Sequence, residues 1–153
     1  MNDEGRKCVM VIAEGLPLGL VANTAAVLAV TLGRTLDGIV GPAVVDASGQ
    51  AHTGIVNITL PILTAASTAI GRIRAQAAAL NDTFVVDVTD VAQRTRTYAD
   101  YTEQIGATPA EALTYLGIAL YGPRKSIGKL TGNLPLLRDP QPNPAEHPDS
   151  NAH

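Results

Sequence analysis

The sequence predicts a three-layer α/β domain, with helices on both faces of a sheet. Short apolar segments rich in β-branched residues alternate along the chain with longer segments rich in Ala and Leu. The composition is 46% hydrophobic but only 3% aromatic, so Ala, Val, Leu and Ile must build a core of the kind that packs helices on a sheet. A length of 153 residues fits one such core.

The domain organisation is predicted from composition. We expect an N-terminal leader over residues 1–6, one α/β domain over residues 7–138, and a disordered, Pro-rich acidic tail over residues 139–153. The tail holds three of the 14 acidic residues and none of the 11 Lys and Arg, so residues 1–138 together are electrically neutral. A neutral domain with no Trp and one Phe lacks the surface that general nucleic-acid binding requires, and we expect none.

The cysteine count and the apolar pattern predict the compartment. Cys8 is the only cysteine, which excludes an internal disulfide and a thiolate metal site and favours a reducing environment. The apolar run over residues 6–30 is divided by Glu14 and by a turn at Gly15 to Gly19, and we expect neither half to span a bilayer. The sequence therefore predicts a cytoplasmic protein without a membrane partner.

The first strand and helix follow from local pattern. Residues 7–13, KCVMVIA, predict a strand covered on both faces, with Cys8 inside. After the turn EGLPLG, residues 20–33 predict a helix ending at Gly33. This helix is apolar over more of its circumference than one sheet covers, so we expect a homodimer.

Residues 37–61 predict a hairpin-like excursion around the turn signal DASG. Asp46 and His52 flank this turn and can pair. The alternation over residues 54–60, GIVNITL, predicts the second core strand.

A second helix is predicted over residues 62–80, because apolar residues recur there at spacings of four and three: Ala66, Ile70, Ile73, Ala77 and Leu80. Arg72, Arg74 and Gln76 fall largely off this stripe and are expected in solvent.

The rest of the chain predicts two more strands, residues 83–90 and 114–122, and further short helices. Thr97 and Asp100 have the spacing of a capping pair, and Thr108 is predicted to cap a helix beginning TPAEAL. A final helix is predicted to end at Gly132.

Two regions resemble known families. Residues 115–137 resemble the end of peptidyl-tRNA hydrolase II enzymes, through the segment YLGIALYGPRKSIGKLTGNLPLL. Residues 8–27 resemble the start of those enzymes, through the segment CVMVIAEGLPLGLVANTAAV. Residues 7–137 resemble more closely a bacterial family catalogued as domain of unknown function 2000, through the patterns LPLGL-AN-A, TYLGIALYGP and KLTGNLPLLR. The resemblance implies a mixed four-stranded sheet in the order 2-1-4-3 with strand 4 antiparallel, and dimers among the relatives.

The same resemblance gives KLTGNLPLL, residues 129–137, a structural role. The last helix would end at Thr131 and Gly132, and the leucines beyond it would pack back onto the core: Leu134, Leu136 and Leu137. In the alternative interpretation, Lys129 and Asn133 lie near a ligand.

The hydrolase residues are only partly matched. Where those enzymes carry a lysine, a glutamine and a histidine on the first helix, this chain has Leu20, Thr24 and Val27. Their aspartate after the third strand is matched by Asp87 or Asp90. The missing positive charge argues against peptidyl-tRNA hydrolysis.

The candidate site lies where parallel strands end, after the first and third strands. The candidate catalytic residues are Asp87, Asp90 and Thr24, with an aspartate as general base on water or on Thr24. The candidate ligand-binding residues are Asn23, which could hold an oxyanion, and four others: Gly19, Thr89, Lys129 and Asn133. In the structural interpretation, Asn23 satisfies buried backbone and one aspartate caps a loop or helix.

Two classes of function remain open. The chain is either a module that binds a small ligand or a protein, or a hydrolase of an aminoacyl or peptidyl ester or amide with an Asn/Thr/Asp site. His52 is the only histidine in the domain, so we expect no metal and no cofactor.

Overall fold

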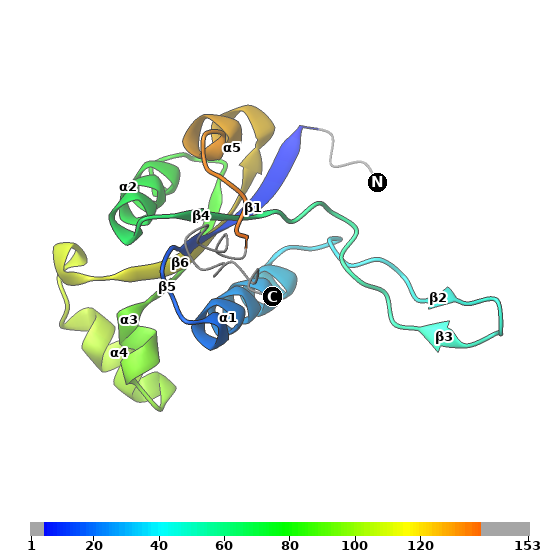
Figure 1. Cartoon of the computed structure of the whole chain (residues 1–153), viewed down its shortest axis with the longest axis horizontal. Coiled ribbons are helices and arrows are strands. Elements are labelled where there is room, and N and C mark those ends of the chain that lie inside the picture. Colours follow the sequence, from blue (N-terminus) through cyan, green and yellow to red (C-terminus); the bar gives the residue numbers. More distant parts are fainter. Residues whose placement is uncertain (1–4, 139–153) are drawn as a thin grey trace, which may run out of the picture.

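The computed structural model describes residues 5–138, so the predicted tail and most of the predicted leader lie outside the described residues. A four-stranded mixed sheet forms the centre (Figure 1). Its strands are β1 (Arg6–Ala13), β4 (Ile62–Ala65), β5 (Phe84–Thr89) and β6 (Tyr115–Pro123), in the order β4-β1-β6-β5. β4 is parallel to β1, whereas β6 is antiparallel to both of its neighbours.

Helices cover both faces of this sheet (Figure 1). α1 (Leu18–Thr35) packs on one face with Cys8, Met10 and Ile12, which alternate along β1. α2 (Ser67–Ala78) and α5 (Arg124–Thr131) lie on the other face, where Val9 and Val11 point. β1 is therefore buried on both sides, as its continuous apolar pattern predicts, and Cys8 lies inside.

The prediction for the second strand is wrong in position. Residues 54–60 do not form a core strand; β4 follows Pro61, and α2 begins only at Ser67. Leu63 and Ala65 are buried while Ile62 and Thr64 are less so, which is the period of a strand and not of a helix. The hydroxyl of Thr64 also donates to the carbonyl of Ile12 at 3.0 Å, which ties β4 to β1.

The stretch after β5 is also more irregular than predicted. α3 (Asp90–Arg94) follows the strand directly, and α4 (Tyr98–Gly106) has the predicted cap, since the amide of Asp100 donates to the side chain of Thr97. The predicted cap at Thr108 is wrong. Its hydroxyl donates back to the carbonyl of Gln104 at 2.7 Å, and the segment beyond it forms one 3₁₀ turn, η1 (Ala110–Ala112).

Residues 37–61, called the arm here, connect α1 to β4. They form a narrow ribbon in which β2 (Val44–Val45) pairs antiparallel with β3 (Ala51–His52) around the predicted turn. Figure 1 shows the arm extending well away from the sheet and its helices. Near its base, the amide of Gly41 donates to the carbonyl of Ile55, and the amide of Asn57 donates to the carbonyl of Ile39, both at 2.9 Å.

α1 is longer than the sequence predicts. It starts at Leu18 and spans 18 residues, and by length and composition alone it is able to cross a membrane, contrary to the prediction for this half of the apolar run. Buried core helices and signal sequences pass the same test. In this structure Thr24, Leu28 and Leu32 are buried against the sheet.

The segment after α5 closes the sheet. Gly132 is the C-cap of α5, as predicted. Residues 133–137 then run antiparallel along the outer edge of β4, where the amide of Thr64 donates to the carbonyl of Pro135 and the amide of Leu137 to that of Ile62. Leu134 packs on the core, but Leu136 is 47% exposed, so KLTGNLPLL contributes backbone pairing as much as burial.

Candidate functional site

The strand directions define one edge of the sheet as the candidate site. β1, β4 and β5 all run the same way, because β4 is parallel to β1 and both β1 and β5 are antiparallel to β6. Their carboxyl ends therefore lie at one edge, from which α1 and α2 also start (Figure 1). This is the edge where ligands gather in sheets of this kind.

Thr24 is completely buried beneath this edge. A side chain at Gly117 of β6 would come within 2.8 Å of the methyl carbon of Thr24 and 3.0 Å of Ile12 Cδ1, so only glycine lets α1 approach the sheet this closely. Among the described residues, the hydroxyl of Thr24 has no hydrogen-bond partner. In the sequence, the glycine at position 117 within the apolar run YLGIALYG is the feature that could indicate such close packing of a helix on the strand.

Thr89 shares this property. It ends β5 just after a register shift at Val88, its exposed fraction is 1%, and its hydroxyl also has no partner among the described residues. Thr24 and Thr89 are thus predicted ligand-binding or catalytic residues that lie inside the fold. Neither presents its hydroxyl to solvent.

Asp87 lies on the other face of the sheet from Thr24. Nε of Arg74, on α2, donates to its carboxylate at 3.1 Å, whereas Thr24 lies on the α1 face together with Ile12. The structure therefore does not bring Asp87 and Thr24 together. Arg74 was expected in solvent, but it is partly buried and holds this ion pair.

A tyrosine near Asp87 was missed by sequence reasoning. Tyr101, on α4, has its pKa raised above the usual tyrosine value, first by burial and then by the negative charge of Asp87. Its ring lies 5.6 Å from that of Tyr98, centroid to centroid. Because α4 has no buried residue that would give it an apolar stripe, and α3 separates it from β5 along the chain, no local pattern indicated this contact.

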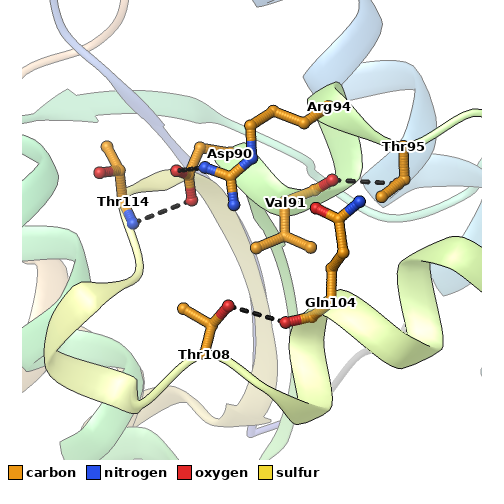
Figure 2. A network of polar contacts seen from close by, with 7 residues as sticks. All are labelled: Asp90, Val91, Arg94, Thr95, Gln104, Thr108 and Thr114. Atoms are coloured by element: carbon orange, nitrogen blue, oxygen red, sulfur yellow. Dashed lines mark hydrogen bonds and ion pairs between the residues drawn. The ribbon is translucent and has the colours of Figure 1, made fainter.

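Asp90 holds the end of β5 to the start of β6, as Figure 2 shows. One carboxylate oxygen accepts from Nη1 of Arg94 at 2.7 Å, and the other accepts from the amide of Thr114 at 3.1 Å. The amide of Asp90 donates in turn to the carbonyl of Thr114 at 2.9 Å. These contacts agree with the structural interpretation of one aspartate as a cap.

The remaining candidates are exposed. Gly19 and Asn23 lie on α1, Lys129 lies on α5, and Asn133 follows its C-cap. Asn23 faces away from the buried side of its helix, so it does not satisfy buried backbone as the structural interpretation expects.

The turn of the arm holds a side-chain hydrogen bond between Asp46 and His52. His52 Nε2 lies 3.0 Å from a carboxylate oxygen of Asp46, as the sequence suggested. The pKa of Asp46 is lowered, chiefly by His52 and then by the backbone amides of Gln50 and Ser48. Within residues 5–138, no three His, Cys, Asp or Glu side chains are grouped to hold a metal ion.

The four-stranded mixed sheet and the helices on its two faces define a small α/β domain. The chain belongs to the family described as "Protein of unknown function (DUF2000)", whose model matches residues 6–138. A solved structure titled as a protein of unknown function, Atu0240 from Agrobacterium tumefaciens strain C58, is similar to it with a TM-score of 0.80 at 16% identity. The likeness covers 88% of this chain and 98% of that one, and it shows the fold alone. No curated protein matches.

Proposed function

We propose that this chain is a cytoplasmic binding module, for a small ligand or a protein, on a peptidyl-tRNA hydrolase II-like scaffold. When only the strands of the central sheet are numbered, strands 1 to 4 are β1, β4, β5 and β6. The order β4-β1-β6-β5 then reads 2-1-4-3 with strand 4 antiparallel, which supports this scaffold. The single cysteine, which is buried, is in keeping with a reducing compartment.

One observation favours binding over hydrolysis: the candidate catalytic side chains lie apart, and both aspartates already have ion-pair or hydrogen-bond partners within the fold. Asp87 is paired with Arg74 across the sheet from Thr24, and both oxygens of Asp90 accept hydrogen bonds. A general base must reach the proton it abstracts, directly or through one water. Neither aspartate meets that requirement toward Thr24, whose hydroxyl is itself buried.

The experiment is turnover of an N-blocked aminoacyl-tRNA by the purified chain, with Asp87→Asn and Asp90→Asn beside it. We expect no cleavage above background from any of the three proteins. Cleavage by the wild-type chain that one substitution abolishes would overturn the proposal and would restore the hydrolase with that aspartate as its base. Circular dichroism of each variant controls for folding, because both aspartates hold structural contacts.

A further inference from the structure

The two helices that share one face of the sheet carry basic side chains and no acidic ones. α2, α5 and residues 132–138 contain no Asp or Glu, and their Lys and Arg residues are Arg72, Arg74, Arg124, Lys125, Lys129 and Arg138. The surface that these elements form is called the basic face here. We propose that the acidic C-terminal segment of this chain, residues 139–153, docks on the basic face.

The elements of the basic face lie next to one another in the fold. α2 contacts α5, and both helices pack on one core cluster, which Leu134 also joins (Figure 1). Lys125 and Lys129 are four residues apart and exposed, so they lie on the same outward side of α5. The positive charge therefore comes from several adjacent elements and not from one helix.

Most of this charge has no counter-charge in the part of the chain that the structure describes. Arg74 pairs with Asp87 at 3.1 Å, but the five other cations form no ion pair with any of residues 5–138. The acids of the domain lie elsewhere, because residues 47–81 and 112–138 contain none. Since like charges gathered on one surface repel one another, an acidic segment bound there relieves that repulsion.

The C-terminal segment has the complementary charge. It contains Asp139, Glu146 and Asp149 and no Lys or Arg. It also contains no Val, Leu, Ile, Met, Phe, Tyr or Trp, so charge is its main means of binding a surface. Its prolines restrict the backbone before docking, which reduces the conformational entropy that docking costs.

The described part of the chain ends beside the basic face. The amide of Leu137 donates to Ile62 of β4, and Arg138 follows as the last described residue. The segment beyond it reaches about 50 Å when extended, whereas a domain of this size has a radius of gyration of about 14 Å. The tether also keeps the acids at a local concentration on the order of millimolar, so weak contacts between charges are populated.

Other anionic partners fit the basic face less well. α2 and α5 contain no aromatic side chain on which the bases of a single-stranded nucleic acid could stack. A free nucleic acid or an anionic membrane must in addition displace a segment that is tethered beside the face. The charge and the tether therefore select the C-terminal segment, and this inference is independent of the proposed binding function.

The first test follows the segment within the full chain. A nitroxide spin label is attached through Ala145→Cys, because Cys8 is buried and protected from the reagent. We expect the label to broaden backbone amide signals of α5 and of the exposed side of α2 more than those of α4 and the arm. This difference should be lost in about 1 M salt, where the Debye length is about 3 Å. Equal broadening of all four elements at low salt would overturn the proposal.

The second test removes charge from the basic face. Lys125→Gln together with Lys129→Gln should abolish the preferential broadening of α5 by the labelled segment. The matched control is Arg34→Gln together with Arg96→Gln, which removes two exposed cations that lie outside the basic face and should leave the broadening unchanged. Equal effects of the two pairs would contradict docking on this face.

The third test removes charge from the segment itself. Asp139→Asn, Glu146→Gln and Asp149→Asn together should also abolish the preferential broadening, while the folded domain keeps its sequence. Broadening that survives these substitutions would overturn the proposal. If the wild-type segment shows no contact, and a DNA duplex or phosphatidylserine vesicles instead shift the amide signals of α2 and α5, the basic face belongs to that anion and the proposal is wrong.

Discussion

Three buried threonine hydroxyl groups differ in whether they have a hydrogen-bond partner. Thr24, Thr89 and Thr131 are all nearly or fully buried, but within residues 5–138 only the hydroxyl of Thr131 has a partner, the carbonyl of Ile127 at 2.8 Å. A buried hydroxyl without a partner costs free energy that a methyl group of the same shape does not. Replacing threonine by valine should therefore have opposite effects on the free energy of unfolding at Thr24 and at Thr131.

We expect Thr24→Val to raise the free energy of unfolding by about 1–3 kcal/mol, because it removes an unsatisfied polar atom. Thr131→Val is the matched control and should lower it by about 1 kcal/mol, because it removes a made hydrogen bond. Urea denaturation followed by circular dichroism measures both. If Thr24→Val destabilises the chain as much as Thr131→Val does, the Thr24 hydroxyl has a partner in solution, such as a water molecule or a ligand.

The second residue-scale prediction concerns Tyr101 at high pH. Burial and then the charge of Asp87 raise its pKa, so Asp87→Asn should lower that pKa while leaving it above the usual tyrosine value. A raised folded-state pKa gives stability that is present below the ordinary tyrosine pKa and lost as the pH rises through the raised one. Asp87→Asn should narrow the pH range between the ordinary and the raised tyrosine pKa, over which this stability is lost.

Phenolate absorbance, taken as the difference between chains with Tyr101 and with Tyr101→Phe, follows this titration when both chains also carry Tyr98→Phe, because Tyr98 interacts with Tyr101 and itself titrates. Asp90→Asn is the control, because Asp90 is not among the causes of the shift. A Tyr101 pKa unchanged by Asp87→Asn would show that the two groups are not close in solution.

At the scale of elements, the outer edge of β4 depends on residues 133–137. The amide of Leu137 donates to Ile62, and proline has no such donor. We expect Leu137→Pro to lower the free energy of unfolding by about 1 kcal/mol more than Leu137→Ala, which shortens the side chain but keeps the amide. Equal denaturant midpoints for the two variants would contradict this role. Leu137→Pro should also aggregate more readily, since it loosens the cover of an edge strand.

Some elements were predictable from the sequence because their signals are local. β1 and β6 follow from continuous apolar runs, and the end of α5 follows from Gly132. The cap at Thr97 follows from the spacing between Thr97 and Asp100. The second core strand was misplaced because residues 54–60 alternate as well as a strand does, yet they belong to the arm. Only pairing with β1, which is remote in sequence, selects residues 62–65.

The candidate site was less predictable for a geometric reason. Asp87 follows Val85 and Val86, which pack on opposite faces of a sheet covered on both sides. Apolar residues on both faces give no signal for the direction of the next side chain, and a one-residue difference reverses it. The position of Asp87 became clear only from its contact with Arg74.

At the scale of the whole molecule, β6 is the last strand in the sequence but lies between β1 and β5. The ribosome must therefore complete residues 115–123 before either neighbour has its central partner. Until then, β1 has only β4 as a partner and β5 has no partner in the sheet, so a nascent chain leaves apolar strand edges open to other chains or to chaperones. Folding of the whole sheet is postponed until residues 115–123 have been synthesised, so a translational pause before residue 115 is the moment at which this chain is most exposed to misassembly.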